Sequence, residues 1–303
     1  MIHPKALRPG DRLAVLCGSS PTSKTPEELT DAVRAMGLEP VLYPSATAKH
    51  GFLSGDDAMR AADINAAFAD DSIAGIVCTR GGYGFHRVLP LLDWDTIRKH
   101  PKLFGGYSDV TAMLNALNQI CGQESYHMPM VGAWSDGLDA YTGPFVRSML
   151  FDEPVPYENP QGEPITTLVP GTACGPLCGG NLSLLAASMG TPYEIDTKGK
   201  ILFIEEVGEK PYKVDGMLTN LRNGGKFDDA AGIILGAFTR CEEPGEVKTG
   251  LTLDEVFQEL IVPAGKPAIS GVVCGHCNPT MALPMGRIFR MDAAAGTFGP
   301  ADK

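Results

Sequence analysis

Residues 103–117 read LFGGYSDVTAMLNAL, a stretch that joins an apolar run, two glycines, a serine and a helical pattern. The run at residues 103–106 predicts a short buried strand, and residues 109–120 predict a helix directly after a turn. Because glycine has no Cβ atom to clash in a tight turn, we expect the hydroxyl of Ser108 to project above the sheet. The backbone N–H of Asp109 would then open the helix and is suited to bind a developing oxyanion.

Outward from this stretch, short β-branched runs alternate with helical patterns through the first half of the chain. Alternation of this kind predicts a parallel sheet with helices on both faces, which is a Rossmann-like α/β fold. The helix predicted over residues 56–68 has one apolar face, made of Met59, Ala62 or Asp63, and Ala66. Strands are predicted at residues 12–17, 41–43, 73–78 and 103–106, and helices at 25–36, 56–68, 94–100 and 109–120.

The composition changes at residues 151–172, which contain five prolines and no hydrophobic period. This change predicts a linker at residues 151–170 between an N-terminal domain of residues 1–150 and a second, smaller α/β domain of residues 171–303. Strands of the second domain are predicted at residues 200–205, 232–238 and 268–274, and its helices at 181–189, 212–222 and 253–260.

Composition and charge exclude several classes of protein. The chain has 303 residues and a formal net charge of −11, and 44% of its residues are hydrophobic. These values are typical of a globular protein, and the acidic balance argues against a nucleic-acid partner. No apolar stretch approaches the length of a membrane span, and charged Asp11 and Arg12 interrupt the N-terminus before a signal peptide could form. We therefore expect a cytoplasmic protein with reduced thiols and no membrane partner.

A second glycine loop, TRGGYG at residues 79–84, follows the predicted strand at residues 73–78. Loops at the carboxyl ends of parallel strands bind ligands, and the backbone N–H groups of Gly81 and Gly82 could approach one closely. The spacing differs from that of a nucleotide-binding loop, and a plain turn is the open alternative.

A serine nucleophile needs a base, and six histidines are available. His86 and His127 lie near the candidate loops, and His276 follows the predicted strand at residues 268–274. Glu205 and Glu206 come directly after an apolar run, so one of them is a candidate partner for the base. Taken alone, the pattern around Ser108 favours a simple helix cap, since such caps are common.

The eight cysteines include two close pairs. Cys274 and Cys277 could form a redox dithiol, or could join Cys174 and Cys178 in a zinc site. A redox pair should open a helix, whereas Asn278 and Pro279 follow directly here. We therefore assign no metal ligand and no cofactor.

Six ordered blocks of the chain resemble the serine LD-carboxypeptidases, the muramoyltetrapeptide carboxypeptidase family, which also contains the microcin C immunity peptidases. The resemblance covers essentially the whole chain. The blocks are PGDRLAVLCGSSP (9–21), TRGGYGFHRVLPLLDW (79–94), FGGYSDVTAML (104–114), GGNLSLLAASMGTPYEID (179–196), ILFIEEVGEKPYKVDGMLTNLR (201–222) and CGHCNPTMALPMG (274–286).

This resemblance implies a catalytic triad of Ser108, Glu205 and His276 that spans two domains. It also implies an oxyanion hole built from the backbone N–H groups of Asp109 and Gly82. The neighbouring Glu206 would point to the opposite face of the strand. Residues of the matched blocks that are expected to bind substrate are Arg80, Gly81 and Asn181.

The resemblance further implies the reaction. Enzymes of this family remove the terminal D-alanine of cytoplasmic muropeptide tetrapeptides in peptidoglycan recycling, and the bond that they cleave lies next to an L-configured centre. The resemblance also implies a homodimer. The alternative substrate is an aminoacyl-sulfamoyl or phosphoramidate adenylate, as in the microcin C immunity peptidases, with Trp134 placed to stack on the adenine. A ligand-binding module with an inactive triad is a further alternative, but all three triad positions carry competent side chains.

Overall fold

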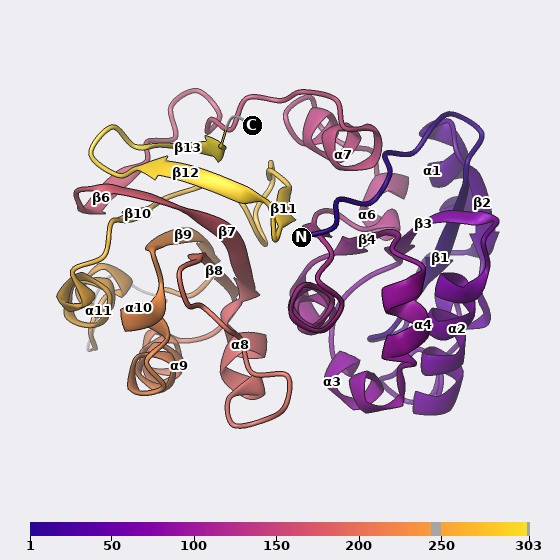
Figure 1. The fold of residues 1–303 in the computed structure, drawn as a ribbon, viewed down its shortest axis with the longest axis horizontal. Coiled ribbons are helices and arrows are strands. Elements are labelled where there is room, and N and C mark those ends of the chain that lie inside the picture. The colour runs from indigo at the N-terminus through magenta and orange to yellow at the C-terminus, as the bar shows by residue number, and fades with distance from the viewer. Residues whose placement is uncertain (244–249, 302–303) are drawn as a thin grey trace. The chain divides into compact units, whose positions relative to one another are not determined.

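The computed structural model describes residues 1–243 and 250–301, which form two compact units (Figure 1). The N-terminal unit comprises Met1–Val155 together with Ala282–Met285. The C-terminal unit comprises Pro156–Met281 together with the chain from Gly286 onward. The chain therefore crosses from one unit to the other three times, once at residue 155 and again on either side of the short segment 282–285.

The N-terminal unit is built on a six-stranded sheet in the order β11-β5-β4-β3-β1-β2. Neighbouring strands are parallel except for β11, which pairs antiparallel with β5. The order reverses between β1 and β3, and ligands of doubly wound sheets bind at the carboxyl ends of strands beside such a reversal. The strands are β1 (Arg12–Leu16), β2 (Glu39–Leu42), β3 (Ile73–Cys78), β4 (Leu103–Gly106), β5 (Ser125–His127) and β11 (Leu283–Met285).

Helices flank this sheet and fill its core with aromatic rings. The Phe104 ring of β4 stacks on Phe68 of α2 at 6.0 Å and meets Phe85 of α3 edge-on at 6.4 Å. Helix α1 begins with a capping box, in which Thr25 and Glu28 bond each other's backbone N–H groups. The helices are α1 (Pro26–Ala35), α2 (Asp57–Ala69), α3 (Phe85–Val88), α4 (Trp94–Lys99), α5 (Thr111–Ala116), α6 (Val131–Ser135) and α7 (Thr142–Phe151).

The buried face of α2 differs from the predicted one. Met59 is 37% exposed, and Ala62 and Ala66 are exposed as well. Of the predicted positions only Asp63 is buried, because the helix face that packs also carries Arg60, whose buried guanidinium donates to backbone carbonyls. The residues that α2 buries are Arg60, Ala61, Asp63, Ile64, Ala67 and Phe68.

The C-terminal unit contains a seven-stranded mixed sheet in the order β13-β12-β7-β8-β9-β10-β6. Its centre, from β7 to β10, is parallel, and antiparallel strands extend it on both sides. Apolar side chains of α8, α9 and α11 pack with β8 and β9 in one core cluster. The strands are β6 (Thr166–Val169), β7 (Thr172–Asn181), β8 (Ile201–Val207), β9 (Gly232–Thr239), β10 (Ala268–Ser270), β12 (Ile288–Asp292) and β13 (Thr297–Pro300), and the helices are α8 (Leu182–Ser188), α9 (Pro211–Asn223), α10 (Lys226–Asp229) and α11 (Leu253–Leu260).

Two segments of this unit differ from the sequence-based expectation. Strand β6 lies within residues 151–170, the expected linker, because it pairs with β10. The strand expected over residues 268–274 ends at Ser270, because Gly271 has a φ of +79° that extended backbone does not allow. The predicted fold class, a helix-flanked parallel sheet followed by a second α/β domain, is confirmed. Of the helices in the described ranges, none has the length and apolar character of a membrane span.

Candidate active site

Ser108 stands on a strained turn at the carboxyl end of β4. Its φ is +63°, in the left-handed region that non-glycine residues rarely occupy, at a cost of about 1–3 kcal/mol. Tyr107 occupies the N-cap position of the following 3-10 turn, and no side chain makes a capping hydrogen bond there. The interpretation of Ser108 as a simple helix cap is therefore wrong. A Cβ atom on Gly106 would lie 2.8 Å from Val110, so the turn needs glycine at that position.

The glycine loop after β3 lies directly against this turn. A Cβ atom on Gly81 would lie 2.6 Å from the Cβ and 2.8 Å from the Oγ of Ser108. Gly82 has a φ of +119°, and a Cβ atom there would lie 2.5 Å from the Oγ of Ser20. The Ser20 hydroxyl in turn accepts a hydrogen bond of 3.1 Å from the N–H of Tyr83. The loops after β1, β3 and β4 thus meet around Ser108, with glycine wherever a side chain would collide.

Arg80 is an exposed residue at the start of the same loop. Its Nε donates to the Gly81 carbonyl at 3.2 Å, and its Nη1 donates to the Pro21 carbonyl at 3.1 Å. These bonds hold the guanidinium at the solvent edge of the loops, where it can meet an anionic ligand.

Trp134 does not occupy the expected position. The side chain lies in the core of the N-terminal unit, where it is 6% exposed and its Nε1 donates to the Pro129 carbonyl at 2.8 Å. A ring packed in this way does not offer a face to an adenine. The expectation that Trp134 stacks on a nucleotide is therefore wrong, because its apolar surface is used in the core.

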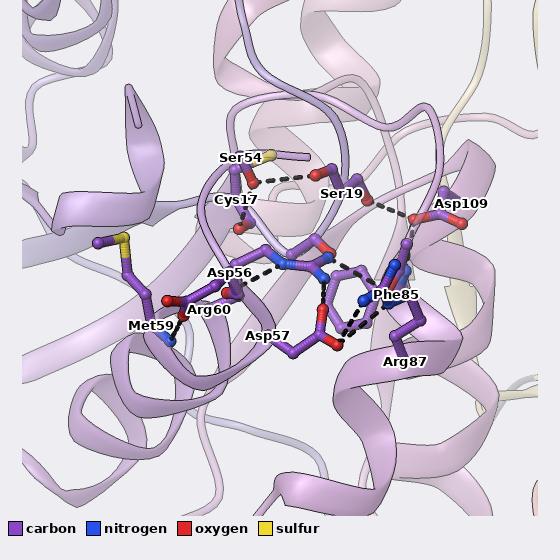
Figure 2. A network of polar contacts seen from close by, with 12 residues as sticks. Cys17, Ser19, Ser54, Asp56, Asp57, Met59, Arg60, Phe85, Arg87 and Asp109 are labelled. Atoms are coloured by element: carbon purple, nitrogen blue, oxygen red, sulfur yellow. Dashed lines mark hydrogen bonds and ion pairs between the residues drawn. The ribbon is translucent and has the colours of Figure 1, made fainter. Parts of the chain in front are cut away.

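The carboxylate of Asp109 has a role that the sequence did not reveal. It is buried, and it accepts a hydrogen bond of 2.6 Å from the Ser19 hydroxyl and one of 2.8 Å from the Phe85 N–H (Figure 2). Burial raises the pKa of the Asp109 carboxyl above its usual range, while these donors act in the opposite direction. The residue that follows Ser108 is therefore anchored by buried hydrogen bonds. An aspartate directly after the turn serine was the available signal.

In the C-terminal unit, Glu205 and His276 form a hydrogen-bonded pair. The Oε2 of Glu205 lies 2.7 Å from the Nδ1 of His276 and also accepts the His276 backbone N–H at 3.1 Å. Glu205 is fully buried near the end of β8, and the His276 side chain is 16% exposed. Because a carboxylate can only accept, Nδ1 carries the ring proton and Nε2 is the basic nitrogen. Gly275 permits this contact, since a Cβ atom there would lie 2.6 Å from Oε2.

Glu206 faces a different set of partners. The register of β8 against β9 shifts between Ile204 and Glu206. The Glu206 carboxylate accepts from the N–H and the hydroxyl of Ser183, both at 2.7 Å, and from the Nδ2 of Asn181 at 3.1 Å. Glu206 therefore stabilises the start of α8. Asn181, expected to bind substrate, is buried in this structural contact instead.

The cysteines do not have the environment of a redox pair or a zinc site. Burial raises the pKa of the Cys277 thiol, and it raises that of Cys274 well above the usual value. Redox-active thiols require the opposite shift. The cysteines are free thiols, and in the described parts of the chain no three His, Cys, Asp or Glu residues are grouped to hold a metal ion.

Known proteins are similar to this chain over both units. Models of the LD-carboxypeptidase N-terminal and C-terminal domains match residues 13–128 and 174–291. A probable murein peptide carboxypeptidase of Bacillus subtilis is 41% identical over 300 residues, which cover 97% of this chain and 92% of that protein. Two solved structures, each 26% identical, are also similar. The similarity to a muramoyltetrapeptide carboxypeptidase from Oxalobacter formigenes has a TM-score of 0.80 and covers 95% of this chain and 97% of that protein's chain. An MccF-like protein from Bacillus anthracis has a TM-score of 0.84 and covers 96% of each chain.

The resemblance seen in the six sequence blocks is confirmed by these matches. They extend over both units, so that the nucleophile turn and the Glu205–His276 pair fall within matched domains. The chain belongs to the LD-carboxypeptidase family and is a serine peptidase.

Proposed function

We propose that this protein removes the terminal D-alanine from muropeptide tetrapeptides through an acyl-enzyme formed on Ser108. The observation that carries the proposal is the Ser108 turn, where a serine is held at a φ of +63° against a glycine loop. Strain of this kind persists where the surrounding structure imposes it, as it does at nucleophiles on strand-to-helix turns. The names of the Bacillus subtilis and Oxalobacter formigenes relatives supply the substrate class.

In the proposed reaction His276 serves as general base and then as general acid. Its Nε2 takes the proton of Ser108 as Oγ attacks the carbonyl carbon of the terminal amide, and the backbone N–H groups of Asp109 and Gly82 hold the oxyanion. His276 then protonates the leaving amine, and D-alanine departs. Water attacks the acyl-enzyme by the reverse sequence of proton transfers. Glu205 keeps Nδ1 protonated and stabilises the imidazolium.

The course of the chain supports a triad shared by the two units. Only residues 277–282 separate His276 from β11, which belongs to the sheet of the N-terminal unit. In that sheet β11 pairs with β5, and β5 pairs with β4, the strand that leads to Ser108. The chain therefore links the candidate base to the sheet that carries the candidate nucleophile through six residues.

A carboxypeptidase must also recognise the free carboxylate at the end of its substrate. We assign this role to Arg80, because it is exposed at the loop that contacts Ser108 and is held there by the Pro21 and Gly81 carbonyls. Action in cytoplasmic peptidoglycan recycling, as a homodimer, is part of the same proposal and rests on the family resemblance.

Release of D-alanine tests the proposal. The purified protein is incubated with the tetrapeptide L-Ala-γ-D-Glu-meso-diaminopimelate-D-Ala, and free D-alanine is measured with D-amino-acid oxidase. The same peptide ending in L-alanine is the control for stereochemistry. We expect D-alanine from the wild type and none from Ser108→Ala, and no L-alanine, measured with L-alanine dehydrogenase, from the control peptide. Cleavage of an aminoacyl-sulfamoyl adenosine without release of D-alanine would favour the alternative substrate class, which the burial of Trp134 does not support.

A further inference from the structure

We propose that the Asp109 side chain is a positioning residue that sets the oxyanion hole by fastening three loops together. The group that does so is called here the loop brace, and it consists of Ser19, Arg60, Phe85 and Asp109. This inference rests on the proposed function for its catalytic meaning, and on the hydrogen bonds of the N-terminal unit for its geometry.

One oxygen of Asp109 joins the loops that follow three adjacent strands. The Ser19 hydroxyl comes from the loop after β1 and donates to Oδ2 at 2.6 Å. The Phe85 N–H comes from the end of the glycine loop after β3 and donates to the same oxygen at 2.8 Å. Asp109 itself follows Ser108 at the end of β4. All three residues are buried, and hydrogen bonds to a charged acceptor are strong where water is excluded.

Arg60 fastens two of these loops from the side of α2 (Figure 2). Its Nη1 donates to the Gly18 carbonyl at 2.5 Å and to the Gly84 carbonyl at 3.2 Å, and its Nη2 pairs with the Asp57 carboxylate. Arg60 is fully buried, so its charge needs these partners. Each of the two loops is therefore bound twice, once by an arginine and once by an aspartate.

The proposed oxyanion donor Gly82 lies between two anchored residues of its loop. Before it, the Gly81 carbonyl accepts the Ser20 N–H at 3.4 Å, and after it, the Tyr83 N–H donates to the Ser20 hydroxyl. Beyond Tyr83, the loop brace holds Gly84 and Phe85. Because Asp109 also supplies the second proposed donor from its backbone, one residue fixes both donors relative to Ser108. A shift of about 1 Å in such a group can lower a rate by about 100-fold.

Two variants and a matched control test the loop brace. Ser19→Ala removes one donor to Asp109, and Asp109→Asn replaces the charged acceptor by a neutral amide, which weakens both hydrogen bonds to Oδ2. Ser125→Ala is the control, because Ser125 is also fully buried and donates to a carbonyl, that of Leu114, but lies at the start of β5. The three proteins are compared with the wild type for D-alanine release from the tetrapeptide. Hydrogen exchange of the peptides that contain residues 81–85 is measured in parallel.

We expect kcat to fall about 10-fold in Ser19→Ala and about 100-fold in Asp109→Asn, with KM within about twofold of the wild type. Exchange at residues 81–85 should rise in both, and Ser125→Ala should change neither quantity. Unchanged exchange in Ser19→Ala and Asp109→Asn overturns the loop brace. Faster exchange with unchanged kcat overturns its catalytic role.

If the wild type releases no D-alanine, the proposed function fails and the exchange data alone decide whether the brace exists.

Discussion

In the N-terminal unit the candidate nucleophile depends on backbone geometry, whereas in the C-terminal unit the candidate base depends on a pair of side chains. Ser108 has a φ of +63° and lies against Gly81, with no room for an added methyl group. His276 is oriented by one carboxylate oxygen of Glu205 at 2.7 Å. We therefore expect activity to fall when atoms are added to the glycine loop of the N-terminal unit. In the C-terminal unit, activity should fall when a side chain of the Glu205–His276 pair is shortened or replaced.

Removal of the nucleophile should have the largest effect. We expect Ser108→Ala and His276→Ala each to lower kcat for D-alanine release by about 10⁴-fold or more, because neither partner functions alone. The measurement is release under saturating substrate, with circular dichroism to show that the variants are folded. A residual rate within 100-fold of the wild type in either variant contradicts the triad and with it the comparison between the units.

The next largest effect should separate two adjacent carboxylates of the C-terminal unit. Glu205→Gln should lower kcat by about 10³-fold or more, because the amide no longer fixes the tautomer of His276. Glu206→Gln should leave kcat within about threefold and lower the free energy of unfolding by about 1 kcal/mol, since Glu206 holds Ser183 at the start of α8. Steady-state kinetics and urea denaturation of the two variants check this. Equal kinetic losses would mean that Glu205 has no special role.

Added atoms test the N-terminal unit. Gly82→Ala introduces a Cβ atom 2.5 Å from the Ser20 hydroxyl, and we expect kcat to fall about 100-fold. The matched control is Gly37→Ala, which has a φ of +81° but open space around its Cβ position. The control should lose about 1 kcal/mol of stability and keep its kcat. A kinetic loss of the same size in Gly37→Ala would trace the effect to general strain and not to the loop.

The remaining prediction concerns stability and not kcat, and it compares buried thiols of the two units at alkaline pH. Burial raises the pKa of Cys178 in the C-terminal unit to about 12, from an ordinary value of 9.0. Between these values the unfolded chain loses the proton while the folded chain keeps it. The stability that this group contributes is therefore complete below pH 9.0 and is lost as the pH rises toward 12, by about 1.4 kcal/mol per pH unit.

Urea denaturation at pH 8 to 11 should show this slope reduced in Cys178→Ala. In the N-terminal unit, burial raises the pKa of Cys121 only to about 11, so Cys121→Ala should reduce the slope over a narrower range. An alkaline slope in Cys178→Ala identical to that of the wild type would show that this thiol does not carry the effect.

Much of the fold was predictable where a local apolar pattern was enough to indicate a helix or a strand. Residues 73–78, 103–106 and 253–260 form β3, β4 and α11 with the predicted bounds. Strand β7 was not foreseen, because its sequence TACGPLCGGN contains three glycines and a proline and its stability comes from neighbours on both sides. Strand β11 could not be predicted either, because it has only three residues with Pro284 at its centre. It forms a strand because it pairs with β5.

The candidate site divides in the same way. The triad of Ser108, Glu205 and His276 was predicted because each residue stands in a short motif of the sequence blocks that resemble the family. The roles of Arg60 and the Asp109 carboxylate were missed, because each depends on carbonyls or donors contributed by loops distant in sequence. The expectation for Trp134 came from its proximity in sequence to a candidate loop, and that for Asn181 from its place in a matched sequence block. Neither reveals the direction of a side chain.

The placement of β11 has a consequence for biosynthesis. The sheet of the N-terminal unit takes its edge strand from residues 283–285, which follow β6 to β10 of the C-terminal unit in the sequence. When the first 155 residues have emerged from the ribosome, the outer edge of β5 therefore has no partner strand. Unpaired strand edges can pair with strands of other chains and so promote aggregation. Completion of the N-terminal sheet waits until β6 to β10 of the C-terminal unit have been synthesised, and no single cut in the gene would yield two self-sufficient pieces.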